Sequence, residues 1–228
     1  MRDRRPPSPP IVRSLPRWFA DPMLNTIARA AFTRLFRPLA RLLLRLGLTP
    51  DAVTYIGTIG VCAGALVFYP LGHLFWGTVV ITVFVFCDML DGIMARETGR
   101  NSLWGAFLDS TLDRIADSAV FIGLALWFFL GADDPLTALL ALGCLVTGSI
   151  VSYVRARAEG LGVHASGGIA ERADRLLVTL VVTGLVGMGV PDIVLTVALG
   201  VLMIACCITI LQRISSVRRQ LLENHETS

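Results

Sequence analysis

The sequence predicts an all-α integral membrane protein: six transmembrane helices preceded by an interfacial amphipathic helix, with both termini in the cytoplasm. Three observations lead to this fold class. The chain has 228 residues, of which 54% are hydrophobic and 16% charged, and its mean hydropathy is +0.70. Its apolar segments have the length of a bilayer core, about 20 residues for about 30 Å. Its basic residues gather on alternate connections between those segments.

The six expected spans cover nearly all of the chain after the first fifty residues. Each is mainly apolar and long enough to cross the hydrocarbon layer, or close to that length. The predicted spans are 52–69, 74–96, 104–130, 136–159, 172–190 and 193–214.

Arginine sets the predicted orientation, because all 20 basic residues are arginines. The connections 70–73, 131–135 and 189–192 contain none. Basic loops stay in the cytoplasm, so both termini and the arginine-bearing loops are expected on the inner side of the cell membrane. Nucleic acid is not an expected partner, because no basic patch is interleaved with exposed aromatic residues.

The segments before and after the spans differ in composition. Residues 1–22 are rich in Pro and Arg, and form either a cytoplasmic tail or an extension ahead of a natural start at Met23. Residues 23–47 alternate arginines with apolar residues at helical spacing, which predicts a juxtamembrane helix lying on anionic headgroups. A packed amphipathic helix without lipid contact is the alternative. The six-helix domain is expected over 48–216, followed by a cytoplasmic tail at 217–228.

Four carboxylates stand where a membrane-buried chain would avoid charge. Asp88 and Asp91 are three residues apart near the end of the second span, and Asp109 and Asp113 are four apart near the start of the third. Each pair shares one helix face. A short loop joins the two spans, so we expect antiparallel neighbours whose carboxylates converge. Hard oxygen ligands of this kind suit Mg²⁺ or Mn²⁺.

Two other interpretations of these carboxylates exist. They could form salt bridges at helix ends with Arg96, Arg100 and Arg114. They could also line the pathway of a cation or proton transporter. A transporter predicts acids near the midplane and often interrupted helices, whereas these acids lie close to the cytoplasmic loop and the outer half has no matching polar path.

The residues around the carboxylates define a motif. In order it reads Asp88-x2-Asp91-Gly92-x2-Ala95-Arg96-x8-Gly105-x3-Asp109-x3-Asp113. This spacing resembles the signature of the CDP-alcohol phosphotransferase family, in which a CDP-linked lipid is attacked by an alcohol and CMP is released. The resemblance implies two metal ions, one held by Asp88, Asp91 and Asp109 and the other by Asp88, Asp109 and Asp113. It also implies that Asp113 is the general base.

The same resemblance implies a nucleotide pocket that binds the CDP-diacylglycerol donor. Its expected contacts are Asp51, Thr54, Gly92, Arg96 and Ser102. Asp51 could instead, or in addition, cap the first span after a proline.

Asp117 continues the four-residue spacing of Asp109 and Asp113 but lies outside the motif. We expect it to support the metal ligands or to pair helices, ahead of binding a metal itself.

A second group of arginines points to a phosphorylated acceptor. Arginine binds phosphate oxygens in a bidentate manner, and five guanidiniums at the cytoplasmic ends of three spans exceed what orientation requires. They are Arg155, Arg157, Arg172, Arg175 and Arg213.

The chain from Met23 to about Arg219 also resembles the bacterial phosphatidylinositol phosphate synthases. That resemblance implies transfer to inositol 1-phosphate and a homodimer in the membrane. Arg155 is a departure, since lysine is expected there. The alternative acceptor is glycerol 3-phosphate, as in a phosphatidylglycerophosphate synthase. The cysteines are expected to be small packing residues, because their spacing fits no metal site.

Overall fold

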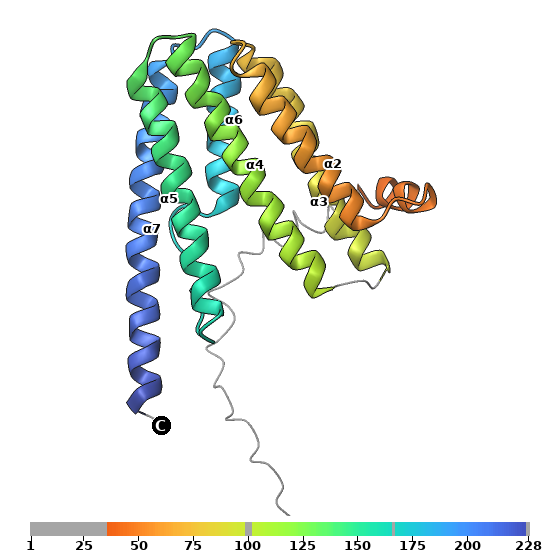
Figure 1. The fold of residues 1–228 in the computed structure, drawn as a ribbon, viewed down its shortest axis with the longest axis vertical. Coiled ribbons are helices and arrows are strands. Elements are labelled where there is room, and N and C mark those ends of the chain that lie inside the picture. Colours follow the sequence, from red (N-terminus) through yellow and green to blue (C-terminus); the bar gives the residue numbers. More distant parts are fainter. Residues whose placement is uncertain (1–35, 99–101, 166, 227–228) are drawn as a thin grey trace, which may run out of the picture.

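A computed structural model describes residues 36–98, 102–165 and 167–226 of the chain. All regular structure within these ranges is helical (Figure 1). A short helix at residues 36–45 comes first. It is followed by α2 (Pro50–Ala63), its π-helical continuation η2 (Gly64–Phe68), α3 (Leu74–Thr98), α4 (Leu103–Leu130), α5 (Pro135–Glu159), α6 (Arg172–Gly187) and α7 (Ile193–Glu226).

The helices from α2 to α7 form a bundle in which successive helices run in opposite directions. In Figure 1, α2, α4 and α6 rise toward the connections drawn at the top, and α3, α5 and α7 descend from them. α2 packs against both α3 and α4, and α5 packs against α4 and α7. All three arginine-free connections therefore lie at one end of the bundle, and the arginine-bearing ends of the helices lie at the other.

Four of these helices are long and apolar enough to cross a membrane: Pro50–Phe68, Leu74–Glu97, Pro135–Glu159 and Ile193–Glu223. The six predicted spans all form helices of the bundle, but two do not meet this criterion. α4 carries several charged side chains in its first half, and α6 has only 16 residues, about 24 Å of helix. The count of six membrane spans therefore stays a prediction.

Polar side chains fix where the helices begin. Thr49 caps α2 by accepting a hydrogen bond from the Ala52 amide, with an O···N distance of 3.2 Å. Ser102 caps α4 in the same way. The proposed capping role of Asp51 is thus wrong, because the helix begins at Pro50 and the cap falls one residue before it. Asp51 lies in the first turn instead, and its carboxylate is not used for capping.

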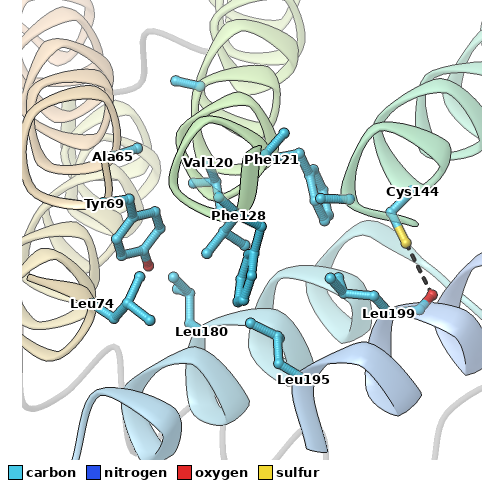
Figure 2. Close-up of a cluster of buried hydrophobic side chains, with 14 of the residues drawn as sticks. Ala65, Tyr69, Leu74, Val120, Phe121, Phe128, Cys144, Leu180, Leu195 and Leu199 are labelled. Carbon is cyan, nitrogen blue, oxygen red and sulfur yellow. Dashed lines mark hydrogen bonds between the residues drawn. The ribbon is translucent and has the colours of Figure 1, made fainter. Parts of the chain in front are cut away.

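The centre of the bundle is an apolar core to which all the long helices contribute (Figure 2). Tyr69 and Phe128 are fully buried in it. Gly123 allows α4 to approach η2 closely, since an added Cβ would lie 2.3 Å from the Ala65 carbonyl oxygen. Cys144 is buried here too and donates to the Leu199 carbonyl, as expected for a packing cysteine. This core lies toward the arginine-free end and holds the helices around the polar sites below it.

The helix at residues 36–45 lies beside the start of α2, at the right of Figure 1. Ala40 is buried in a small cluster with apolar residues of α2 and α3. Arg37 and Arg41 both pair with Glu97 of α3, at 2.8 and 3.1 Å. The described part of the predicted amphipathic helix therefore packs against the bundle. The rest of its predicted range, residues 23–35, lies outside the described residues.

Candidate active site

The motif carboxylates come from two helices that run antiparallel but make few contacts with each other in the described chain. Asp91 lies on α3, and Asp109 and Asp113 lie on α4. The expected antiparallel arrangement is present, and α2 packs against both helices. Asp88 also belongs to α3, but its side chain lies outside the described part of the structure.

A cavity of about 560 Å³ fills the space between the starts of α2 and α4 and the end of α3. Asp91 and Asp109 both line it. So do four of the five residues expected to contact the CDP-linked donor. The described residues of its lining are Thr49, Pro50, Asp51, Thr54, Asp91, Gly92, Ala95, Ser102, Gly105, Ala106 and Asp109. The structure thus brings the donor residues and two of the carboxylates into one open space.

Arg96, the fifth expected donor residue, does not line the cavity but stands beside it. Its guanidinium nitrogens would lie 3.8 and 4.0 Å from a Cβ added to Gly92. Gly92 itself is part of the lining. The Arg96 guanidinium therefore lies within van der Waals distance of the space that a side chain at position 92 would occupy.

Thr54 connects the first helix of the bundle to the carboxylates. Its hydroxyl donates to Asp91 and also lies within hydrogen-bond distance of the Pro50 carbonyl. The side chain is almost fully buried. It therefore fixes the orientation of the Asp91 carboxylate at the wall of the cavity.

Asp113 is held differently from the other motif carboxylates. Arg172 of α6 lies 2.7 Å from one of its oxygens, and Arg114 lies 3.8 Å from the other. The alternative of helix-end salt bridges thus describes Asp113, although its main partner is Arg172, which that interpretation did not include.

Asp117 lies one turn further along α4 and is surrounded by guanidiniums. Arg172 donates to its carboxylate through Nε at 3.1 Å, and Arg114 and Arg175 lie 3.7 and 3.9 Å away. The side chain is only 13% exposed. Asp117 pairs α4 with α6, as the sequence suggested, and serves as the shared counter-ion of three arginines.

Two of the expected acceptor arginines are buried and bind backbone carbonyls. Arg175 donates to the Ala170 carbonyl at 3.3 Å. Arg213 of α7 donates to the carbonyls of Gly167 and Val151, at 2.9 and 2.8 Å. Both therefore hold the loop between α5 and α6 against the bundle.

The remaining two expected acceptor arginines are exposed at the end of α5. Arg155 pairs with Glu159 at 3.0 Å and lies close enough to Arg213 to interact with it electrostatically. Arg157 lines a separate groove between α5 and α7. The structure thus gathers Arg155, Arg175 and Arg213 in one region, with Arg172 beside them on α6, and places Arg157 apart.

Arg114 entered the sequence-based interpretation only as a possible salt-bridge partner of the carboxylates, whereas the structure places it at the centre of this region. It donates to Ser152 of α5 through one terminal nitrogen. Its Nε is buried and has no hydrogen-bond partner in the described chain. The signal was present in the sequence, because Arg114 directly follows Asp113 and stands three residues before Asp117, on the same helix face.

The oxygen donors fit a hard divalent cation. Asp91 and Asp109 line the same cavity, and Asp109 and Asp113 both lie close enough to Asp91 to repel it. Like charges brought together in this way favour a bound cation. Among the described side chains, no three carboxylates, histidines or cysteines converge on one point.

Comparison with known proteins identifies the family. The chain matches the CDP-alcohol phosphatidyltransferase family over residues 47–211. It is 52% identical over 204 residues to a phosphatidylinositol phosphate synthase of Streptomyces avermitilis, covering 87% of this chain and 84% of that protein. For the enzyme of Mycolicibacterium smegmatis the identity is 47% over 199 residues, covering 84% and 87%.

Solved structures are similar as well. A crystal structure of Mycobacterium tuberculosis phosphatidylinositol phosphate synthase with CDP-DAG bound superposes with a TM-score of 0.78, at 45% identity, covering 81% of this chain and 94% of that one. A second structure of that enzyme, with manganese and citrate, gives a TM-score of 0.76 at 45% identity, covering 79% and 87%. With the motif, the helical bundle and these relatives in agreement, the chain belongs to the CDP-alcohol phosphatidyltransferase family.

Proposed function

We infer that this protein transfers the phosphatidyl group of CDP-diacylglycerol to inositol 1-phosphate, giving phosphatidylinositol phosphate and CMP. The observation that carries this inference is the juxtaposition of two polar regions along α4. One is the open cavity with Asp91 and Asp109. The other is the arginine cluster around Asp117. Relatives whose sequences are 47% and 52% identical to this chain are named phosphatidylinositol phosphate synthase.

We propose that the donor binds in the cavity, with Asp51, Thr54, Gly92 and Ser102 around the CDP moiety and Arg96 near its diphosphate. A diphosphate carries negative charge, and a guanidinium beside it supplies bidentate hydrogen bonds. Because the cavity is already about 560 Å³, the nucleotide part of the donor needs little rearrangement to enter.

We assign the metal site to Asp88, Asp91, Asp109 and Asp113, holding two Mg²⁺ or Mn²⁺ ions. A structure of a relative contains manganese, and the number of ions is our proposal. When bound, divalent cations would neutralise the diphosphate and stabilise the departing CMP. Thr54 orients Asp91 for this role through its hydrogen bond.

The acceptor is activated by Asp113. Its carboxylate takes the proton of the acceptor hydroxyl as that oxygen bonds to the phosphorus next to diacylglycerol. The bond from this phosphorus to the CMP oxygen breaks, and CMP leaves with the bonding electron pair. Arg172 lies between Asp113 and Asp117, so a phosphate that attracts Arg172 would also release the carboxylate of Asp113.

The acceptor phosphate is proposed to bind Arg155, Arg172, Arg175 and Arg213, together with Arg114. Arg114 offers the buried Nε that has no partner within the described chain. We leave Arg157 out of this set, because it faces a different groove. Cavities beside the cluster measure only about 10 Å³, so some of the internal ion pairs must open to admit the acceptor.

The arginine-bearing end of the bundle is proposed to face the cytoplasm, with the active site opening there, and the catalytic unit is assigned to residues 48–216. We also propose that two copies pair through their membrane helices. The apolar helix surfaces exposed along the bundle leave room for such a contact. Light scattering in mild detergent and cross-linking in membranes would test this, and a monomer by both methods would contradict it.

The test of the reaction is CMP release by the purified protein with CDP-diacylglycerol and a panel of acceptors. Inositol 1-phosphate should support turnover, and unphosphorylated inositol and serine should not. Asp91→Asn serves as the inactive control. Faster turnover with glycerol 3-phosphate would show that glycerol 3-phosphate is the acceptor, and the donor and the type of reaction would stand. The absence of CMP release with any alcohol would overturn the whole assignment.

A further inference from the structure

A groove of about 400 Å³ lies between the end of α5 and the last part of α7. Most of its described lining is apolar, and the charged residues among the described ones are two arginines. The described residues of the lining are Tyr153, Val154, Arg157, Ala158, Leu161, Ile214, Val217, Arg218, Leu221 and Leu222. It shares no residue with the donor cavity. Its α7 wall lies beyond residues 47–211, the part that matches the family.

The length of α7 places this groove at the depth of the lipid headgroups. The helix has 34 residues, about 51 Å at 1.5 Å per residue. A hydrocarbon layer of about 30 Å takes up roughly 20 of them. With the start of α7 at the opposite face, Ile214 and the residues after it lie where acyl chains meet phosphates.

The two arginines of the groove differ from those of the acceptor cluster. In the described part of the chain, neither Arg157 nor Arg218 has a carboxylate partner, and both are exposed. Arg155, two residues before Arg157, is paired with Glu159. The groove therefore offers two uncompensated positive charges above an apolar wall.

We propose that this groove binds one anionic phospholipid of the surrounding membrane. Its acyl chain would cover the apolar wall, which includes the half-exposed side chains of Leu161 and Leu222. Its phosphate would lie between Arg157 and Arg218, with both guanidiniums donating. A soluble anion would leave the apolar wall in water, and a zwitterionic lipid would bring its own positive charge against the arginines.

Neighbouring arginines provide a matched control. Arg218 lines the groove and Arg219, next to it on the same helix, does not, although both are exposed. The experiment measures binding of phosphatidylglycerol and of phosphatidylcholine with the same acyl chains to the delipidated full chain, by native mass spectrometry. Phosphatidylglycerol should bind more tightly. Attraction between one arginine and an anionic headgroup predicts a loss of about fivefold for Arg218→Gln or Arg157→Gln and about 25-fold for both together.

The control variants separate lipid binding in the groove from general charge effects and from contacts between protein copies. Arg219→Gln and the donor-site variant Asp91→Asn should bind phosphatidylglycerol as tightly as the unmodified chain, and Arg218→Lys should keep most of the affinity. Glycerol phosphate without acyl chains should not displace the lipid. Equal binding of the two lipids, or equal losses for Arg218→Gln and Arg219→Gln, would overturn the proposal. A change in the dimer fraction with unchanged lipid binding would do so too, because the groove would then be a protein interface.

Discussion

The donor cavity and the acceptor region share helix α4 but differ in how their charges are treated. In the donor cavity, Asp91 and Asp109 face open space, and the side chain that donates to Asp91 is the neutral hydroxyl of Thr54. The acceptor region consists of Asp113, Asp117 and the arginines around them. Its arginines and carboxylates neutralise each other, and the adjoining cavities are about 10 Å³ each. One site is open before any ligand arrives, and the other is closed by its own ion pairs.

This difference indicates what each substrate has to do. If the substrates bind as proposed, the donor enters a preformed space whose carboxylates repel one another, so it should bind best with cations present. The acceptor would have to replace internal partners, and its phosphate would offer the arginines a stronger anion than a carboxylate. Arg172 contacts both Asp113 and Asp117. If Asp113 is the base and the arginines bind the acceptor, as proposed, acceptor binding and activation of the base are coupled in this arrangement.

The largest loss of activity is expected from substitutions in the open donor cavity. Asp91→Asn and Asp109→Asn should each reduce CMP release at least a hundredfold, because losing a metal ligand removes several kcal/mol of transition-state stabilisation. EDTA should abolish turnover of the unmodified chain, and Mg²⁺ or Mn²⁺ should restore it. Asp134→Asn, which alters the cap of α5 near the other end of the bundle, is the control and should stay active. Turnover that survives chelation would remove the metal from the mechanism.

The next effect tests whether the closed site depends on Asp117. Asp117→Asn leaves three guanidiniums close together without their shared counter-ion. Breaking a buried pair in this way costs about 3 kcal/mol, which corresponds to a fall in Tm of roughly 6–12 °C. Inositol 1-phosphate should then raise the Tm of the variant more than that of the unmodified chain, because the ligand replaces the missing charge.

Asp174→Asn is the matched control for this measurement. It removes a carboxylate that caps α6 rather than one that neutralises the cluster. The ligand should raise its Tm as much as that of the unmodified chain. If the ligand stabilised Asp117→Asn no more than Asp174→Asn, Asp117 would be an ordinary helix-pairing residue.

A third test separates the two substrates kinetically. Arg175→Ala and Arg213→Ala should raise the KM for inositol 1-phosphate by about tenfold to a hundredfold, since a charge-assisted hydrogen bond contributes roughly 1.5–3 kcal/mol. The KM for CDP-diacylglycerol should stay the same, and Arg96→Ala should show the opposite bias. Arg175→Lys and Arg213→Lys keep the charge, so they are expected to show intermediate effects and to report on folding. An equal change in both KM values would show that the arginines act only through the loop they hold.

The open site was the easier one to predict from the sequence. Asp91, Gly92 and Asp109 lie at fixed spacing on helices, so the helical period and the motif predicted that they lie together. Asp51 and Thr54 were predicted from the family resemblance. The part played by α2 was not predicted. The short connection between α3 and α4 predicted antiparallel neighbours, and the structure shows in addition that α2 packs against both. Sequence distance along a loop does not reveal a third helix that enters from earlier in the chain.

The closed site could be predicted only as a list of arginines. Which partner each guanidinium finds depends on contacts between distant segments: Arg213 binds the carbonyl of Gly167, 46 residues away, and that of Val151, 62 residues away. Arg157 and Arg155 are nearly adjacent in sequence, yet only Arg157 lines the α5–α7 groove. The sequence shows that arginines gather near one membrane face. Which of them set the orientation, which bind substrate and which contact lipid can be inferred only from the fold.

The smallest effect is expected at Ser102, at the start of α4. Ser102 lines the donor cavity and also caps the helix through the Gly105 amide, at 2.9 Å. Loss of the cap in Ser102→Ala costs about 1 kcal/mol of stability, and loss of one neutral contact to CDP should raise the KM for CDP-diacylglycerol less than about tenfold. Ser102→Thr keeps a capping hydroxyl and should retain the stability. If Ser102→Ala lowers the Tm and leaves the donor KM unchanged, Ser102 acts as a cap alone. A change in the acceptor KM would instead mean that the start of α4 positions Asp113 and its arginines, and the open and closed regions would then be less independent than their geometry indicates.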